Sequence, residues 1–398
     1  MDEIFGVPAA EFRADPYGHY RRMRTLDPVH FIADPGLWAL TRYTDVVAAL
    51  RDERLSAERF QLTFPEMQAS ALISSFAGMM LLRDPPDHTR LRLLVSKAFT
   101  PRVVERLQPR VQSIVDGLID AVERRGETDL MQSIAGPLPV MVIAELLGLP
   151  WSDREQLKRW SDALVILADG SLALAGFPQA EQSAAEFKEY LGGILAERRA
   201  RPGNDLRDDL ISGLLAAHER DDRLTEDELF ATCVLLLIAG HETTTNLIGN
   251  GMLALLRHPD QSTRLRSDPS LIRSAIEELL RYESPVQLTS RVAKVDLEIG
   301  GKPVRTGQEV CLVLGAANRD PAQFADPDRL DLARVDNHHL AFGLGLHFCL
   351  GAPLARLEGQ IAVASLLRRL PELRLASDAV EWREGIMMRA LTALPITW

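Results

Sequence analysis

Phe342-Gly343-Leu344-Gly345-Leu346-His347-Phe348-Cys349-Leu350-Gly351 is the stretch that decides the fold of this chain. Its glycines at 343 and 345 allow positive φ angles, so the backbone here can approach a flat ligand closely. A helix-forming run with Pro353 in its first turn follows directly, which places Cys349 at a loop-to-helix junction. Backbone N–H groups and the helix dipole favour a thiolate at such a junction, and a thiolate is a soft metal ligand.

Other interpretations of this stretch compete with metal binding. A lone cysteine is most often a small buried hydrophobe. The dinucleotide pattern G-x-G-x-x-G fails because position 348 is Phe. A zinc site could use His338, His339, His347 and Cys349, but zinc ligands normally occur as closely spaced pairs. Only His347 and Cys349 lie that close, and the sequence contains no C-x-x-C.

Composition indicates a globular protein without nucleic-acid or membrane partners. The 398 residues contain no low-complexity linker, and 46% are apolar while 25% are charged. A net charge of −11 argues against nucleic acid, which requires a basic face. The three cysteines, at 233, 311 and 349, are far apart and predict no disulfide framework. No N-terminal stretch is apolar enough for a signal peptide or membrane anchor, so we expect a cytoplasmic protein.

Helices and short hairpins alternate in the N-terminal third of the sequence. We expect a helix over Asp15–Thr25, a hairpin of residues 29–32 and 37–40, and a helix from Thr44 as its cap to Leu50. From Phe60 to Leu82 the chain is apolar without clean periodicity, which indicates either a buried irregular segment or a cover over a ligand. Asp87 is a plausible cap for the next helix, on which His88 and Arg92 share one face.

A long helical region follows. Thr100-Pro101 begins a helix with a core-facing apolar stripe, and helical pattern continues to about Ala200, with breaks near Gly170 and at 176–178. Thr225-Glu226-Asp227-Glu228 is a capping box that begins a helix of about thirty residues. Residues 233–238 of that helix are apolar on all sides and must be buried.

Polar residues interrupt this buried run, in Ala239-Gly240-His241-Glu242-Thr243-Thr244-Thr245. A buried carboxylate is costly unless it has partners or a function. The threonines could simply hydrogen-bond carbonyls of the preceding turn. Alternatively, Gly240 leaves room for a ligand beside the backbone, while Glu242 and Thr243 supply protons. We favour the functional interpretation because Cys349 stands in the same chain.

The C-terminal half carries an ion-pair pattern and several strands. Glu278 and Arg281 stand three apart on one helix face and can pair, although Glu277 is an alternative partner for Arg281. A short strand is expected over residues 286–293, where alternation separates Leu288 from Thr289 and Arg291. Gly300-Gly301 turns a hairpin, residues 310–314 form a buried strand with Cys311 in the core, and more strand is expected beyond Leu370.

The ten-residue cysteine stretch resembles the cysteine loop of the cytochrome P450 superfamily, Phe-Gly-x-Gly-x-His/Arg-x-Cys-x-Gly, and every fixed position is met. The residues around Glu242 resemble the family's oxygen-activating sequence, Ala/Gly-Gly-x-Asp/Glu-Thr. Glu278-x-x-Arg281 resembles its structural ion pair, with Arg329 as the third member. These motifs occur in family order and span nearly the whole chain.

The resemblance implies a haem b whose iron is axially ligated by Cys349, a ligand that favours O–O cleavage. It implies that His88, Arg92, Arg291 and His347 hold the haem propionates. It places Phe342, Gly343, Ala239 and Gly240 beside the cofactor, and Leu288 and Thr289 in the substrate pocket. Parts of residues 60–82 and 163–190, including the break near Gly176, would cover the substrate.

We therefore expect a mainly α fold with a smaller β region, as one cytochrome P450 domain over residues 1–398. The resemblance implies a monooxygenase that inserts one atom of O₂ into an apolar small molecule, such as a polyketide, terpenoid, steroid or fatty acid. Electrons would come from NAD(P)H through a separate ferredoxin and ferredoxin reductase. We expect the ferredoxin, which is acidic, to dock on a basic surface formed by Arg90, Lys97, Arg102 and Arg106.

Two alternatives remain open at this point. A structural zinc protein built on His347 and Cys349 would be colourless, so an absorption spectrum separates it from a haem protein. A haem enzyme that consumes peroxide or rearranges its substrate would not need Glu242 and Thr243. The presence of this pair favours O₂ activation.

Overall fold

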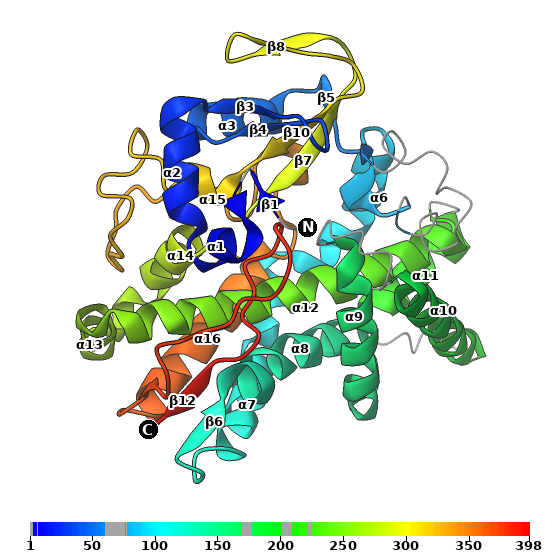
Figure 1. The fold of residues 1–398 in the computed structure, drawn as a ribbon. Coiled ribbons are helices and arrows are strands. Elements are labelled where there is room, and N and C mark those ends of the chain that lie inside the picture. Colours follow the sequence, from blue (N-terminus) through cyan, green and yellow to red (C-terminus); the bar gives the residue numbers. More distant parts are fainter. Residues whose placement is uncertain are drawn as a thin grey trace. The chain divides into compact units, whose positions relative to one another are not determined.

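The structure, a computed structural model, describes residues 3–5, 7–59, 76, 78–168, 177–200, 209–221 and 224–398. The chain divides into two compact units, each assembled from separated segments (Figure 1). The first unit contains Met1–Ser56, Gln108–Leu138 and Thr243–Trp398, and the second contains Ala57–Leu107 and Pro139–Glu242. A single domain over residues 1–398 stays a prediction. None of the helices in the described residues is long and apolar enough to cross a membrane.

The second unit is helical in its described residues. Its elements, some of which continue into the first unit, are η2 (Met80–Leu82), α6 (Asp87–Ser96), η3 (Lys97–Phe99), α7 (Pro101–Asp120), α8 (Pro137–Leu147), η5 (Trp151–Asp153), α9 (Arg154–Ala168), α10 (Phe177–Ala200), α11 (Leu210–Asp221) and α12 (Glu226–Arg257). Helices α9 and α10 pack together through the rings of Trp160 and Phe187, whose centroids are 5.5 Å apart. The break near Gly170 and Gly176 lies outside the described residues.

Helix α12 begins and runs as the sequence predicts. The Thr225 N–H donates to Glu228 Oε2 at 2.9 Å, and the Glu228 N–H donates to Thr225 Oγ1 at 3.1 Å, which confirms the capping box. The helix contains 32 residues, and each residue from Cys233 to Ile238 is at most 7% exposed. The predicted burial of this run is therefore confirmed.

The first unit contains the sheets. Its strands are β1 (Glu3–Ile4), β2 (Val7–Pro8), β3 (Val29–Ile32), β4 (Leu37–Leu40), β5 (Leu55–Ser56), β6 (Glu127–Asp129), β7 (Thr289–Ala293), β8 (Leu297–Ile299), β9 (Lys302–Val304), β10 (Glu309–Leu312), β11 (Arg374–Leu375) and β12 (Pro395–Thr397). Its remaining helices are α1 (Ala9–Ala14), α2 (Pro16–Leu26), α3 (Tyr43–Arg51), η4 (Met131–Ala135), α13 (Pro259–Ser267), η7 (Pro269–Leu271), α14 (Ile272–Tyr282), α15 (Leu314–Ala317), η8 (Gly345–His347) and α16 (Ala352–Arg369).

Five strands form the largest sheet, in the order β3-β4-β10-β7-β5. Side chains alternate across β10, so Val310 and Leu312 join one hydrophobic cluster while Cys311 joins another. The prediction that Cys311 is a core residue is confirmed, since it is 4% exposed. Leu288, just before β7, packs in the same cluster as Cys311, so the structure gives it a core contact.

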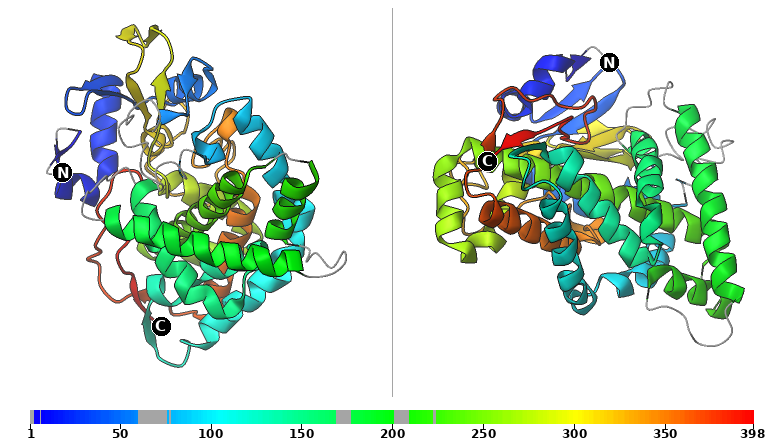
Figure 2. Two further views of the ribbon diagram at one scale, coloured as in Figure 1. Left: turned by 90° about the vertical axis from the view of Figure 1, so that its right-hand side faces the viewer. Right: turned by 90° about the horizontal axis from the view of Figure 1, so that it is seen from below.

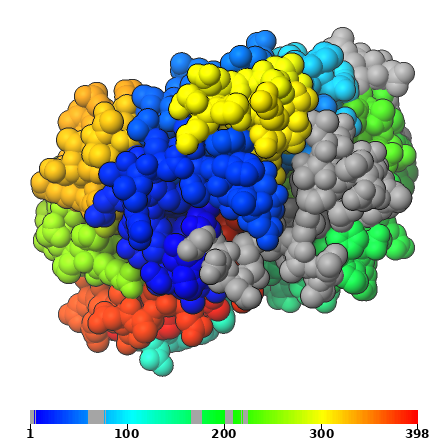
Figure 3. All heavy atoms as spheres, turned by 45° about the horizontal axis from the view of Figure 1, so that its top comes forward, coloured from blue at the N-terminus to red at the C-terminus, as the bar shows by residue number. Residues whose placement is uncertain are grey.

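Two predicted hairpins are confirmed. Strand β3 pairs antiparallel with β4, and β8 pairs antiparallel with β9 around Gly300-Gly301. Gly300 has a φ of +56°, and a Cβ there would lie 2.6 Å from Val29 Cγ2, so both backbone and space favour glycine. The β8–β9 hairpin, yellow in Figure 3, lies over the blue N-terminal residues on that face of the molecule.

Two predicted helix caps are wrong by one or two residues. Helix α3 begins at Tyr43 after Arg42, so Thr44 lies inside the first turn. Helix α6 begins at Asp87 itself, with Pro86 before it, and the Asp87 carboxylate accepts from Arg90. An acidic residue interacts favourably with the helix dipole both at the N-cap and within the first turn. The sequence alone therefore does not show which of these two positions the residue takes.

The C-terminal segment lies against the N-terminal helices, as Figures 1 and 2 show in different views. Arg389 Nε donates to Glu283 Oε1 at 2.8 Å, and the Tyr17 hydroxyl donates to the same oxygen at 3.1 Å. The strand expected beyond Leu370 is limited to the short β11 and β12.

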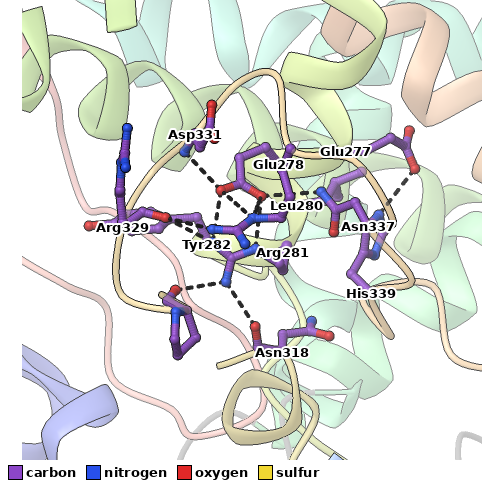
Figure 4. A network of polar contacts seen from close by, with 12 residues as sticks. Glu277, Glu278, Leu280, Arg281, Tyr282, Asn318, Arg329, Asp331, Asn337 and His339 are labelled. Atoms are coloured by element: carbon purple, nitrogen blue, oxygen red, sulfur yellow. Dashed lines mark hydrogen bonds and ion pairs between the residues drawn. The ribbon is translucent and has the colours of Figure 1, made fainter. Parts of the chain in front are cut away.

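A fully buried ion pair lies on α14 (Figure 4). Arg281 Nε donates to Glu278 Oε2 and Arg281 Nη2 donates to Glu278 Oε1, both at 2.8 Å, and both side chains are 0% exposed. This bidentate geometry confirms the predicted pair and excludes Glu277 as the partner of Arg281. Arg281 Nη1 also donates to the carbonyl oxygens of Asn318 and Pro327, at 3.0 and 2.8 Å.

Glu278 binds three further groups in the segment after β10. Its carboxylate accepts from the Asp331 N–H at 2.9 Å, from Arg334 Nε at 3.0 Å and from Asn337 Nδ2 at 3.2 Å. The second arginine of the network is therefore Arg334, and the prediction of Arg329 is wrong. Arg329 contributes only its carbonyl oxygen, which accepts from Arg281 Nη2 at 3.2 Å, while its side chain lies outside the network in Figure 4.

The two arginines give a matched test of this network. Arg334→Ala removes charged hydrogen bonds to a buried carboxylate and should lower the free energy of unfolding by about 1.5–3 kcal/mol. Arg329→Ala removes an exposed side chain and should change it by less than about 0.5 kcal/mol. Urea titration of both variants checks this. Equal losses would contradict the role given to Arg334.

Candidate functional site

The cysteine loop is a closed turn in the first unit. The Cys349 N–H donates to the Phe342 carbonyl oxygen at 2.9 Å, so the two ends of the loop are held together. Gly343 and Gly345 have φ angles of +67° and +75°, as predicted. A Cβ on Gly345 would lie 3.0 Å from the carbonyl oxygen of Leu50, so a side chain there would be crowded as well as strained.

Cys349 is the accessible cysteine of this chain. It lies between η8 and the first turn of α16, where Pro353 takes an early position, and it is half-buried. Cys233 and Cys311 are buried, and burial raises the pKa of the Cys233 thiol to about 12. Cys233 therefore stays a neutral thiol at physiological pH, whereas Cys349 has the exposure and the helix position that suit a metal ligand.

A second polar network, centred on Glu277, contacts residues before and after the cysteine loop. Glu277 Oε1 accepts from Arg356 Nε at 2.7 Å, and Glu277 Oε2 lies 3.1 Å from His339 Nε2. The Arg356 guanidinium stacks over the Phe342 ring at 4.6 Å. Burial alone would raise the pKa of Glu277, but hydrogen bonds from His339 and Arg356 lower that pKa to about 2. These contacts join α14, the start of the cysteine loop and α16.

Sequence reasoning missed His339 and Arg356 in this role. His339 was considered only as a zinc ligand, and Arg356 was treated as part of a helical run. No motif in the sequence marks either residue as a partner of Glu277.

Helix α12 is open on one face in the middle of its buried run. Ala239 is exposed while Gly240 and Thr243 are partly exposed, and these positions share one helix face. A Cβ on Gly240 would lie 3.1 Å from Ile143 Cδ1, so the glycine also allows close packing of α8. Glu242, Thr244 and Thr245 are buried, with Glu242 2% exposed. This face of α12 therefore carries two small residues and one hydroxyl, whereas the preceding turns of the same helix carry large apolar side chains.

The predicted propionate residues are found in both units. His88 is buried and Arg92 partly exposed on α6 of the second unit, and His347 is partly exposed beside Cys349 in the first. Arg291 is 6% exposed on β7, and its Nη1 donates to the Ser290 carbonyl oxygen at 2.8 Å. The buried His88 and Arg291 are consistent with an anionic ligand, and the propionate role of all four residues stays a prediction.

The structure describes only part of the predicted substrate pocket. Thr289 is partly exposed at the start of β7, whereas Leu288 is 5% exposed in the core cluster described above, and a pocket role for either stays a prediction. Residues 60–75, 77 and 169–176 lie outside the described residues. Of the two predicted covering segments, the structure describes 76 and 78–82, where Met80 and Leu82 are buried, and 163–168 and 177–190, which belong to α9 and α10.

A zinc site at the cysteine loop has no support. Within the described part of the chain, one group of three close histidine, cysteine or carboxylate ligands occurs, and it consists of Asp162, His241 and Glu242. His338, His339, His347 and Cys349 form no such group. His339 instead pairs with Glu277, which removes it from the candidate ligands.

Comparison with known proteins decides the family. A sequence model described as "Cytochrome P450" matches residues 174–372. Polyketide biosynthesis cytochrome P450 PksS of Bacillus subtilis is 41% identical, covering 99% of this chain and 98% of its own length. The chain belongs to the cytochrome P450 family.

Further relatives extend this result to activity and structure. Vitamin D(3) 25-hydroxylase of Pseudonocardia autotrophica is 46% identical over 97% of this chain and 94% of its own. The crystal structure of P450BioI in complex with hexadec-9Z-enoic acid ligated acyl carrier protein superimposes with a TM-score of 0.91 at 41% identity, covering 98% of this chain and 100% of that one. This P450 is a monooxygenase, and the predicted mainly α fold with small sheets is confirmed.

The residues present fit a haem. Cys349 offers an accessible sulfur just before a helix, in a loop whose Gly343 and Gly345 have positive φ angles. Ala239 and Gly240 leave the open face of α12 without bulky side chains. An accessible cysteine sulfur is the protein ligand that a haem-thiolate iron requires.

Helix α16 also carries a buried carboxyl, Glu358. It is 2% exposed, and its Oε2 has no hydrogen-bond partner within the described residues. Burial raises the pKa of Glu358 well above its usual range. The folded protein therefore keeps this group protonated at a pH where the unfolded chain ionises it.

This raised pKa gives a pH prediction. Above about pH 4.3 the unfolded state releases a proton that the folded state retains, so stability falls as pH rises from there toward the folded-state pKa. Glu358→Gln should remove this part of the fall. Urea midpoints of wild type and variant between pH 4.5 and 8 measure it. Glu372→Gln, at an exposed position, is the control and should keep the wild-type slope.

Proposed function

We propose that this P450 inserts one atom of O₂ into an apolar small molecule, with a haem b bound through Cys349 and electrons from NAD(P)H. The observation that carries the proposal is the accessible Cys349, held in a closed glycine loop at the start of α16 while the other two cysteines are buried. Haem bound there would supply the O₂ activation that no side chain of the chain can perform.

We assign the cofactor contacts by charge and position. His88, Arg92, Arg291 and His347 are proposed to hold the haem propionates, because carboxylates that leave water need charged or hydrogen-bonding partners. Phe342 and Gly343 are proposed to lie beside the cofactor on the cysteine side, and Ala239 and Gly240 on the α12 side. The Arg356–Phe342 stack would keep that ring in place.

Glu242 and Thr243 are proposed to manage protons. Side chains at adjacent helical positions point about 100° apart, so the two residues cannot do the same task. The partly exposed Thr243 hydroxyl is placed to hold a water or oxygen ligand on the open face of α12. The buried Glu242 is suited to pass protons to it, which is a general-acid role.

The thiolate is tested with the three cysteines. Cys349→Ala should abolish the red-shifted absorption band of the reduced CO complex, because no other thiol can replace the axial ligand. Cys233→Ala and Cys311→Ala should keep the band and serve as controls. Retention of the band in Cys349→Ala would refute the proposed ligand.

The proton roles are tested by coupling. Thr243→Ala should still bind substrate and consume NAD(P)H, but the ratio of product to NAD(P)H should fall, with peroxide or water released in its place. Glu242→Gln should slow turnover more than it lowers that ratio, because proton supply is lost while the open face keeps its shape. Full coupling in Thr243→Ala would assign proton control to another group, such as Thr244.

The substrate is proposed as a polyketide, terpenoid, steroid or fatty acid. PksS is named for polyketide biosynthesis, and P450BioI is seen with an acyl group carried on a protein. A carrier-linked acyl chain is therefore a second candidate form of substrate for this P450. Spectral shifts of the purified protein with a panel of free and carrier-linked compounds would choose between them.

Ferredoxin and ferredoxin reductase are the proposed electron donors, and a cytoplasmic location stays a prediction. Arg90 is removed from the proposed docking surface. Arg90 forms ion pairs with Asp87 and Glu228, so its charge is already balanced within the second unit. Lys97, Arg102 and Arg106 are all exposed and are kept as the proposed docking residues.

A further inference from the structure

His241 joins the buried part of α12 to helix α9. Its side chain is 1% exposed, and its Nδ1 lies 2.9 Å from the hydroxyl of Ser161 and 3.9 Å from Asp162 Oδ1. Ser161 is 0% exposed and also reaches the Leu237 carbonyl oxygen at 3.4 Å. A buried imidazole beside the proposed proton donor Glu242 therefore faces a carboxylate from another helix.

Asp162 stands at the boundary between solvent and interior. Its side chain is 37% exposed, and its Oδ2 accepts from Lys158 Nζ at 2.6 Å. Its other oxygen, Oδ1, is shielded and has no hydrogen-bond partner within the described residues. Lys158 is 40% exposed, so a series of polar side chains connects solvent to the interior. It runs from Lys158 through Asp162 to the buried His241 and Glu242.

The spacing suits a relay through water. Ligand atoms of Asp162, His241 and Glu242 all lie within 4.8 Å of one another. The 3.9 Å between Asp162 Oδ1 and His241 Nδ1 is too long for a direct hydrogen bond, but one bridging water can connect these two atoms. Imidazole is the side chain that most readily gains and loses a proton near neutral pH.

A metal ion is a weaker occupant for these residues. Zinc ligands lie about 2.0–2.2 Å from the ion, so in a tetrahedral site they approach one another to about 3.5 Å. Here His241 Nδ1, the nitrogen that faces Asp162 Oδ1 at 3.9 Å, already contacts the Ser161 hydroxyl. A cation bound between these two atoms would have to displace the Ser161 contact.

We propose that Asp162 and His241 supply Glu242 with protons from solvent. The inference rests on the proposed function, since it gives Glu242 the source of the protons it passes on. In each transfer the His241 imidazolium gives one proton to the Glu242 carboxylate and regains one from water held at Asp162, and bulk solvent returns a proton to that water. No electrons move, and one proton passes inward. Asp162 and His241 act through Glu242 and are positioning residues.

The test compares Asp162→Asn and His241→Gln with wild type in the reconstituted holoenzyme with NAD(P)H, ferredoxin and its reductase. The substrate is one selected by its spectral shift. Both variants should lower the rate of product formation by about tenfold and raise its solvent deuterium isotope effect above the wild-type value. The CO band and the substrate-induced shift should be unchanged. Asp162→Glu should restore much of the rate, because it keeps a carboxylate at the boundary.

Controls separate the relay from general effects. Glu155→Gln neutralises an acid on the same helix, 87% exposed, and should leave rate and isotope effect unchanged. If His241→Gln loses the CO band and is misfolded, Asp162→Asn decides, because it is isosteric and half-exposed.

Each remaining outcome overturns a defined statement. Wild-type rates and isotope effects in both variants would overturn the relay while leaving the monooxygenase proposal intact. A wild type that shows no thiolate CO band and forms no product would overturn both. Wild-type activity that EDTA removes and Zn²⁺ restores, with no such response in Asp162→Asn, would assign a metal site and overturn the relay.

Discussion

The ion pair between Glu278 and Arg281 is the contact on which the first unit depends most. Both side chains are fully buried, so each charge is tolerable only because the other is present. Both side chains also form hydrogen bonds with the segment from Asn318 to Asn337, which leads into the cysteine loop. The adjacent Glu277 binds Arg356 just beyond that loop. Two neighbouring carboxylates on one helix thus hold the chain on both sides of Cys349.

Local signals made most of the fold predictable. The capping box of α12, the hairpins at β3–β4 and β8–β9, and the positive φ angles of Gly343 and Gly345 all arise from a few adjacent residues. Such patterns carry their own physical cause, so they hold in any tertiary setting. The predicted caps of the helices that begin at Tyr43 and Asp87 were wrong by two residues and one residue, because an acid or hydroxyl stabilises the first turn from several positions.

Tertiary partners were less predictable. Arg329 and Arg334 lie in one irregular segment, where no periodicity says which side chain turns inward, and the wrong one was chosen. The sequence allows His339 as a metal ligand, whereas in the structure it contacts Glu277. Asp162 carries no motif, and only the packing of α9 on α12 brings it to His241. Pairs separated by tens of residues are fixed by packing, and one sequence does not record them.

The closed cysteine loop has a consequence for how tightly its sulfur could bind a ligand. The hydrogen bond from Cys349 to Phe342 and the constrained angles of Gly343 and Gly345 already fix the backbone that carries the sulfur. The entropy cost of ordering this segment is met when the polypeptide folds, so coordination of a metal does not have to offset it again. A preorganised sulfur can therefore bind with nearly its full intrinsic strength. The same rigidity limits the directions from which a ligand can approach the sulfur.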